Sequence, residues 1–168
     1  MNTRDKNIVL IGMPGCGKTS LGMLLAQMLG RKLTDIDLCI EEQAGCTISD
    51  IFQEGEEVFR NLETEAVLAL EEEKALIIAT GGGVVKRASN MESLKKNGII
   101  VYIDRSIKDI AADIDIGKRP LLGNRSDRLM QLYSERHELY KKYSDFIVKN
   151  EGEIGETAKK IINILYGG

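Results

Sequence analysis

Short apolar runs alternate along this chain with longer segments whose apolar residues recur every three or four positions. The apolar runs predict buried strands at residues 8–11, 32–34, 76–79, 99–103 and 146–148. Helical spacing predicts helices at about 18–29, over most of 38–73, and at 89–97, 107–112, 127–143 and 156–165, with a polar loop at about 113–126. Strands separated by helices need crossover connections, which give parallel sheets covered on both faces. We therefore predict an α/β fold, a three-layer α/β/α sandwich around a five-stranded parallel sheet.

Two short patterns mark expected helix starts. Thr47 with Asp50, and Ser89 with Glu92, have the spacing of a capping box, in which two side chains satisfy backbone N–H groups at the helix start. Gly98 is expected to end the helix that follows Ser89.

The composition is that of an ordinary globular domain and argues against several classes of protein. The 168 residues suit a single domain over residues 1–168, with 43% hydrophobic and 29% charged residues. A net charge of −3 argues against a nucleic-acid binder, and no apolar run is long enough to cross a membrane. The polar N-terminal residues lack the apolar core of a signal peptide, so we expect a cytoplasmic location. The three scattered cysteines and the single histidine favour free thiols over disulfides or a zinc site.

The residues after the first predicted strand match the complete Walker A pattern, GxxxxGK[ST], and a helix is expected to follow. Successive backbone N–H groups of such a loop converge on phosphate oxygens, and the helix directs its positive end at the same anion. Lys18 is expected to reach the β- and γ-phosphates of ATP, and the Thr19 hydroxyl to bind Mg²⁺. The expected ATP-binding residues are Gly15, Cys16, Gly17, Lys18, Thr19 and Ser20. The alternative is a Gly-rich turn that matches the pattern by chance.

Cys16 lies inside this loop and permits two interpretations. It is either a small residue that fits the loop or a thiol acidified by the helix terminus and sensitive to oxidation.

Two aspartates, Asp35 and Asp37, follow the second predicted strand. Alternate residues on an extended chain point the same way, so both carboxylates could face the site. One could hold Mg²⁺ through water, while the other could orient or deprotonate an acceptor hydroxyl. A solvated turn is the alternative for this pair alone.

Further motifs indicate that the acceptor is a small hydroxy acid. A carboxylate is well bound by the planar fork of arginine, and Arg60 and Arg136 are the candidates. Phosphoryl transfer also needs a cation that neutralises charge and a lid that excludes water, for which Arg119 and the segment at about 113–126 are the candidates. The alternatives are an ion pair of Arg60 with Glu56 or Glu63 on one helix, and an exposed helix charge at Arg136.

Five motifs occur in order, and together they resemble the shikimate kinase family along nearly the whole chain. They are the Walker A loop, Asp35-Ile36-Asp37, the segment Gly55–Glu63, the triple glycine Gly81–Gly83 and the run Arg119-Pro120-Leu121-Leu122. The resemblance implies a P-loop kinase fold like that of the nucleoside monophosphate kinases, with a substrate-binding helical segment at about 35–63. It also implies transfer of the γ-phosphoryl group of ATP to the 3-hydroxyl of shikimate, in the pathway to chorismate and the aromatic amino acids.

The same resemblance implies roles for individual residues. Asp37 lies at the hydroxyl to be phosphorylated, with Lys18 and Arg119 also catalytic, and Asp35 and Thr19 lie near one Mg²⁺ ion. Arg60 and Arg136 hold the shikimate carboxylate, and Glu63 orients Arg60. The remaining substrate-side residues are Gly81, Gly82 and Gly83 of the turn and the pocket-lining Phe52 and Phe59. The partners are thus ATP and shikimate, and because nothing in the sequence demands an oligomer, we expect a monomer.

One position departs from the family pattern, and two other functions stay open. Ala112 stands where members often carry an arginine stacked on adenine, so that contact to the base is not predicted, and the loop at 150–155 is expected to form the other side of the pocket. A kinase for another small hydroxy acid or polyol, such as gluconate, would need the P-loop and lid but not both Arg60 and Arg136. A nucleotide-dependent switch for GTP would need an NKxD motif, which the sequence lacks.

Overall fold

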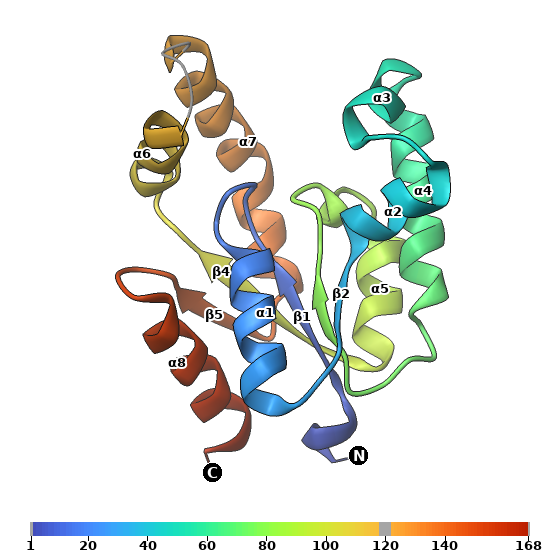
Figure 1. The fold of residues 1–168 in the computed structure, drawn as a ribbon, viewed down its shortest axis with the longest axis vertical. Helices are drawn as coiled ribbons and strands as arrows, with labels where there is room; N and C mark the ends of the chain where they lie inside the picture. The colour runs from blue at the N-terminus through green and yellow to red at the C-terminus, as the bar shows by residue number, and fades with distance from the viewer. Residues whose placement is uncertain (1, 118–121, 168) are drawn as a thin grey trace.

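Alternating helices and strands build the chain in the computed structural model, which describes residues 2–117 and 122–167. The strands are β1 (Asn7–Ile11), β2 (Leu33–Asp35), β3 (Ile77–Ala79), β4 (Gly98–Asp104) and β5 (Phe146–Lys149). The helices are α1 (Lys18–Leu29), α2 (Ile36–Ala44), α3 (Ile48–Gln53), α4 (Glu56–Ala69), α5 (Ala88–Lys96), α6 (Ile107–Gly117), α7 (Leu122–Tyr143) and α8 (Ile154–Tyr166). Two 3₁₀ turns, η1 (Thr3–Asp5) and η2 (Val84–Lys86), complete the described elements (Figure 1).

The five strands form one parallel sheet in the order β2-β3-β1-β4-β5, which confirms the predicted sheet. All five residues of the central strand β1 are buried, as expected for a strand covered on both faces. In parallel strands the carboxyl ends share one edge, so the loop after β1, the start of α2 and the loop after β3 emerge together. The Walker A loop, the two aspartates and the triple glycine therefore meet at this edge.

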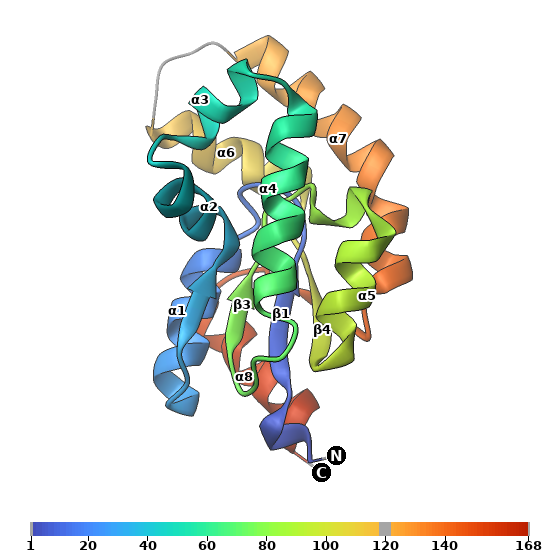
Figure 2. The same ribbon diagram turned by 90° about the vertical axis from the view of Figure 1, so that its right-hand side faces the viewer.

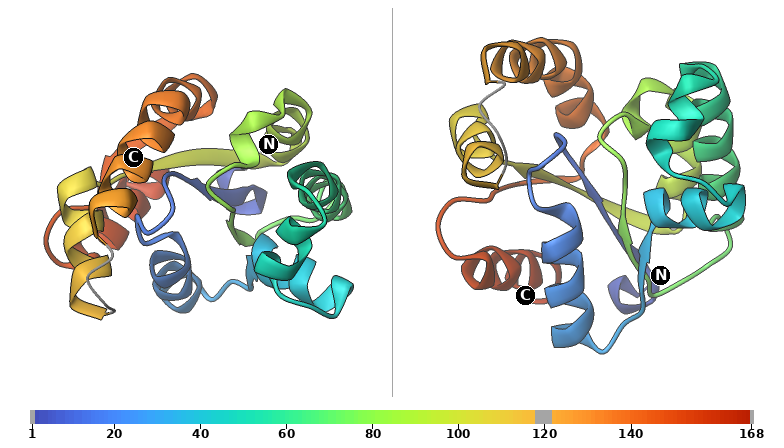
Figure 3. Two further views of the ribbon diagram at one scale, coloured as in Figure 1. Left: turned by 90° about the horizontal axis from the view of Figure 1, so that it is seen from above. Right: turned by 45° about the horizontal axis from the view of Figure 1, so that its top comes forward.

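Helices cover both faces of the sheet and make the three predicted layers. Helices α1 and α8 pack on one face, α5 and α7 on the other, and α4 packs beside α5 (Figure 3). The largest fully buried side chains between the layers include Tyr102 of β4 and Tyr140 of α7. Figure 2 shows α3, α6 and the start of α7 beyond the carboxyl ends of the strands, with both chain ends at the opposite end of the molecule.

The polar loop expected at 113–126 is wrong where the structure describes it. Helix α6 continues to Gly117, and α7 already begins at Leu122. Ile107, Ile110 and Ile114 recur at helical spacing, which continues the amphipathic pattern past the acidic residues between them. The polar composition of the segment concealed that periodicity.

The capping box expected at Ser89 is also wrong, whereas the one at Thr47 is confirmed. Thr47 Oγ1 accepts from the backbone N–H of Asp50, whose carboxylate accepts from the Thr47 N–H. Helix α5 instead begins at Ala88 after Arg87, so Ser89 already lies within its first turn. Gly98 does not end this helix but begins β4, and a Cβ there would lie 2.3 Å from the Leu94 carbonyl oxygen.

No described helix combines the length and the apolar character that a membrane span requires.

Candidate active site

A cavity of about 1090 Å³ lies at the carboxyl edge of the sheet. The phosphate loop, the helices α3 and α4, the triple-glycine turn and α7 all contribute to its walls. Its lining includes Gly15, Gly17, Lys18, Thr19, Ser20, Phe52, Phe59, Arg60, Glu63, Gly81, Gly82, Gly83 and Arg136, together with Asp37. Most of the residues predicted from the sequence therefore border one space.

The phosphate loop joins β1 to α1 and depends on glycine at several positions. Gly15 and Gly17 have φ values of 79° and 99°, which L side chains rarely adopt. The Lys18 side chain is buried, and its ammonium group donates to the carbonyl oxygens of Gly12 at 2.7 Å and Met13 at 2.9 Å. Its charge is therefore fixed inside the loop, where an anionic ligand would need it.

Cys16 is completely buried in this loop, with its Sγ 3.6 Å from the Lys18 Nζ. A Cβ at Gly12 would lie 2.8 Å from that sulfur and 2.6 Å from the carbonyl oxygen of Ile103. The close packing fits the interpretation of Cys16 as a small residue that fills the loop.

Two polar side chains hold the outer side of the loop through contacts that the sequence did not predict. Asn150, which follows β5, donates from Nδ2 to the Cys16 carbonyl oxygen at 2.9 Å, and its Oδ1 accepts from the buried Thr157 hydroxyl. Arg105, which follows β4, donates to the Gly15 carbonyl oxygen at 3.1 Å. Their place at the carboxyl ends of strands was a signal that could have found them.

Thr19 and Asp35 provide a hydroxyl and a carboxylate side by side. The Thr19 hydroxyl donates to Asp35 Oδ2 at 2.8 Å. Mg²⁺ often takes one or two protein oxygens and completes its octahedral shell with phosphate oxygens and water. The hard oxygen pair next to the phosphate loop fits that preference.

The expectation that the two aspartates lie on one extended segment is wrong. Strand β2 ends at Asp35, whose Oδ1 accepts from the Leu38 N–H at 3.2 Å and so caps α2. Asp37 consequently lies in the first turn of this helix. It still borders the cavity because the start of α2 faces the triple-glycine turn, where a Cβ at Gly81 would lie 2.8 Å from Asp37 Oδ1.

Asp37 is a carboxylate with unused hydrogen-bonding capacity. Its Oδ1 is shielded from solvent and has no hydrogen-bond partner among the described residues. Burial raises its pKa above the ordinary aspartate value, the negative charge of Asp35 raises it further, and the positive charge of Lys18 opposes the shift. Such a group accepts a proton more readily than a solvated aspartate does.

Arg60 is buried in the cavity wall, with only 6% of its surface exposed. Its Nη1 donates to Glu63 Oε1 at 2.8 Å and its Nε to Glu56 Oε1 at 3.3 Å, so the ion pairs considered as an alternative are present. The arginine nevertheless borders the cavity, and a Cβ at Gly83 would lie 2.3 Å from its Nη2. The ion pairs therefore hold Arg60 in the site.

An apolar wall lies against the Arg60 guanidinium. The rings of Phe52 and Phe59 stack with centroids 4.6 Å apart, and the guanidinium carbon lies 5.0 Å from the Phe59 centroid. Phe59 is buried, whereas Phe52 is 40% exposed at the mouth of the cavity.

Glu63 is fully buried behind Arg60. Burial raises its pKa, and the positive charge of Arg60 opposes that shift. Its Oε2 has no hydrogen-bond partner in the described part of the chain. The contact with Arg60 is thus its main electrostatic compensation.

Arg136 comes to the cavity from α7, on the opposite side from α4. It is buried with 9% of its surface exposed, and its Nε has no hydrogen-bond partner within residues 2–117 and 122–167. The interpretation of Arg136 as an exposed helix charge is therefore wrong. A buried unpaired guanidinium nitrogen is costly, and an anionic ligand would offset that cost.

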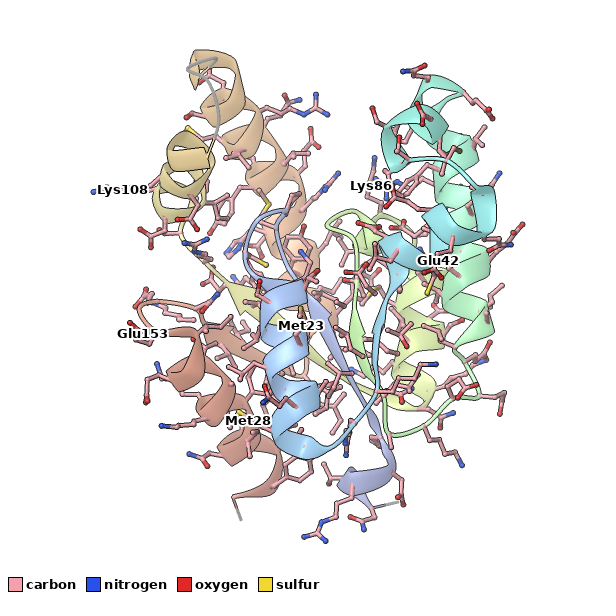
Figure 4. The ribbon with its side chains drawn as sticks, viewed as in Figure 1. Met23, Met28, Glu42, Lys86, Lys108 and Glu153 are labelled. Carbon is pink, nitrogen blue, oxygen red and sulfur yellow. The ribbon has the colours of Figure 1, made fainter. Side chains whose placement is uncertain are left out.

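Tyr140 and Lys86 are two further site residues that the sequence reasoning missed. The Tyr140 hydroxyl donates to the Gly82 carbonyl oxygen at 2.6 Å, and burial raises the pKa of Tyr140 to about 12, so it stays a donor at neutral pH. Lys86 lines the cavity and forms an ion pair with Glu56, whose pKa is lowered mainly by that hydrogen bond. Figure 4 shows Lys86 directed toward the end of the molecule that carries α3.

Two positions complete the comparison with the sequence. Arg119 lies outside the described residues, and Ala112 lies exposed on α6. The described lining combines the phosphate cradle, two buried arginines and the Asp37 carboxylate, on which the charges of both Lys18 and Arg60 act. This arrangement suits transfer of a phosphoryl group to a hydroxyl of a small acid.

Comparisons with known proteins agree on one family. The shikimate kinase family model matches residues 14–166. A shikimate kinase of Clostridium botulinum (strain Eklund 17B / Type B) is 46% identical over 158 residues, which cover 94% of this chain and 96% of that protein. The solved structure of the Acinetobacter baumannii shikimate kinase in complex with shikimate matches with a TM-score of 0.86 and 35% identity, over 96% of this chain and 93% of that one. A gluconokinase from Sinorhizobium meliloti shares the fold with a TM-score of 0.61 but only 14% identity, over 98% of this chain and 93% of that one.

Proposed function

The chain belongs to the shikimate kinase family, and from this premise we propose that it transfers the γ-phosphoryl group of ATP to the 3-hydroxyl of shikimate, giving shikimate 3-phosphate and ADP. The observation that carries the proposal is the pair of buried arginines, Arg60 and Arg136, in the same cavity as the phosphate loop. A carboxylate bound between them would place the body of a small acid beside Asp37. The alternative acceptor, gluconate, has support only from a shared fold.

The phosphate loop would hold the donor. Backbone N–H groups of Gly15 to Ser20 would surround the phosphates, and Lys18 would exchange its carbonyl contacts for phosphate oxygens. Thr19 and Asp35 would hold one Mg²⁺, which would neutralise part of the negative charge of the phosphates. Arg119 is proposed as the mobile cation of a lid at about 113–126.

Asp37 would act on the acceptor hydroxyl. Its carboxylate accepts a hydrogen bond from the hydroxyl and then its proton, while the oxygen attacks the γ-phosphorus. The new O–P bond forms as the bond from the γ-phosphorus to the β-phosphate oxygen breaks, and ADP leaves. The raised pKa of Asp37 favours its role as the proton acceptor.

The acid clamp would hold the other end of the acceptor. Arg60, kept in place by Glu56 and Glu63, and Arg136 would each donate charge-assisted hydrogen bonds to the substrate carboxylate. The Phe52–Phe59 wall would pack against the apolar face of the ring. The triple-glycine turn, Gly81–Gly83, allows close approach because a Cβ at Gly81 or Gly83 would collide with Asp37 or Arg60. The segment at about 35–63 is proposed as the substrate-binding part of one domain.

The test is an assay of ADP release with ATP, Mg²⁺ and either shikimate or gluconate. We expect release that depends on shikimate and on the metal, with no stimulation by gluconate. Stimulation by gluconate alone would replace the proposed acceptor, and release that neither acid stimulates would overturn the proposal. We further propose that the protein acts as a monomer in the cytoplasm, and sedimentation velocity measures the first of these properties.

A further inference from the structure

Arg105 is an arginine of the nucleotide side of the cavity that no sequence motif identified. It lies between β4 and α6, and its side chain lines the cavity together with Ile110 and Asp113 of α6. Its Nη1 donates to the Gly15 carbonyl oxygen at 3.1 Å and lies 2.6 Å from Asp113 Oδ2. One guanidinium nitrogen thus connects the phosphate loop to α6.

These two bonds determine which part of the guanidinium remains available. The N–H groups of a guanidinium lie in its plane, so partners of Nη1 occupy one edge and leave both faces uncovered by these bonds. The Arg105 side chain is 20% exposed, and the Asp113 carboxylate offsets its charge. A neutralised, edge-bonded guanidinium is poorly suited to clamp phosphate but well suited to stack on an aromatic base.

The position of Arg105 is right for a base. The phosphate loop is bordered by α6 through Ile110 and by the loop after β5 through Asn150, so a nucleotide whose phosphates occupy the loop has both segments within reach of its base. Ile110 of α6 is so close to the phosphate loop that a Cβ at Gly15 would lie 3.1 Å from its side chain. On α6 itself, Ala112 offers no planar group, whereas the neighbouring Asp113 holds the guanidinium of Arg105.

We propose that Arg105 contacts the nucleotide base, with its guanidinium plane, fixed by Gly15 and Asp113, stacked against the adenine ring of ATP and ADP. The inference deepens the proposed function, because it assumes that the cavity binds these nucleotides. It makes Arg105 a determinant of nucleotide affinity that acts on the base and not on the phosphates.

The test compares a nucleotide with its phosphate part alone. ADP and inorganic tripolyphosphate are titrated calorimetrically, with Mg²⁺ and without acceptor, into the wild-type protein and the variants Arg105→Ala, Arg105→Lys and Lys108→Ala. Lysine keeps the charge and can still donate to Gly15, but it lacks the plane. Lys108 is an exposed cation three residues further along the chain, in the first turn of α6, and it projects from the outer side of that helix (Figure 4), which makes it the matched control.

We expect Arg105→Ala and Arg105→Lys each to weaken ADP by about two- to thirtyfold, the range of a cation–π contact. Tripolyphosphate affinity should stay within about twofold in all variants, and Lys108→Ala should bind ADP as the wild type does.

Four results would overturn the inference. Unchanged ADP binding in Arg105→Ala would show that another group holds the base. An equal loss of ADP and tripolyphosphate, or full recovery in Arg105→Lys, would show that Arg105 supports the phosphate loop through its charge. If the wild-type protein bound no ADP at all, the proposed function would fail together with this inference. The other results overturn the inference alone, because they concern the Arg105 variants while the wild type still binds ADP.

Discussion

Replacing Gly83 with alanine should weaken the binding of shikimate although Gly83 carries no functional group. The backbone of Gly83 has φ −98° and ψ 6°, which alanine tolerates, so the effect arises from the new methyl group. That methyl would lie 2.3, 2.5 and 2.6 Å from three atoms of the Arg60 guanidinium. Ordinary contact begins near 3.4 Å, so the guanidinium must move by about 1 Å.

A shift of this size is enough to break a charge-assisted hydrogen bond of 2.8 Å, the length of the Arg60–Glu63 bond. A bond of this kind contributes about 1.5–3 kcal/mol, so loss of the corresponding bond to the substrate carboxylate should raise the KM for shikimate about 10- to 150-fold. Strain on the buried ion pair should also lower the free energy of unfolding by about 1–3 kcal/mol and the thermal midpoint by about 2–10 °C.

The assay measures initial rates over a range of shikimate concentrations at saturating MgATP, and ADP affinity by calorimetry. ADP binding should not change, because the phosphate loop is untouched. Gly155→Ala is the matched control, since a Cβ there meets nothing within 4 Å. A wild-type KM in Gly83→Ala would refute the assignment of Arg60 to the acid clamp.

Three further substitutions test other parts of the site. Asp37→Asn should lower kcat by about 10²–10⁴-fold with little change in ADP affinity. Asp37→Asn should also raise the thermal midpoint at neutral pH, because the pKa of Asp37 is raised in the folded state and its ionised form therefore destabilises that state above the unfolded pKa. This gain over the wild type should vanish at acidic pH, where Asp37 is protonated in both states. The control Glu65→Gln, which changes an exposed carboxylate, should show no such gain. Arg136→Ala should raise the KM for shikimate about tenfold or more, whereas a loss on the ADP side would contradict its assignment. Tyr140→Phe removes the hydrogen bond to the triple-glycine turn and should raise the KM for shikimate about two- to tenfold. An equal effect of Tyr143→Phe would show that loss of a tyrosine hydroxyl on α7, and not loss of this hydrogen bond, raises the KM.

The sequence predicted those parts of the molecule that local spacing encodes. The apolar runs predicted all five strands, and the Walker pattern predicted the turn between β1 and α1. Arg60 was identified through the segment Gly55–Glu63 and the resemblance that it carries, and its ion pairs with Glu56 and Glu63 follow from their helical spacing. The errors are also local. The acidic residues of α6 concealed its helical period, and Ser89 imitated a cap inside a helix that Arg87 precedes.

The supporting residues were missed because their partners are distant along the chain. Asn150 binds a carbonyl oxygen 134 residues away, Arg105 one 90 residues away and Tyr140 one 58 residues away. No spacing rule joins such positions, because only the order of the strands in the sheet brings them together. What a sequence can offer is their location at the carboxyl ends of strands, which selects candidates without naming partners.

The two carboxylate oxygens of Asp35 contact different helices and so connect the phosphate-loop side of the site to the helix that carries Asp37. Oδ2 meets Thr19 at the start of α1, while Oδ1 caps α2, the helix that carries Asp37. Charge brought to one oxygen alters the acceptor strength of the other, and with it the order of the first turn of α2. Under the proposed function, this contact would couple the two ligands: the factor by which the metal–nucleotide complex changed shikimate affinity would equal the factor by which shikimate changed nucleotide affinity. Asparagine caps a helix about as well as aspartate but carries no charge, so Asp35→Asn should keep the start of α2 and remove this electrostatic coupling between the two sides of the site.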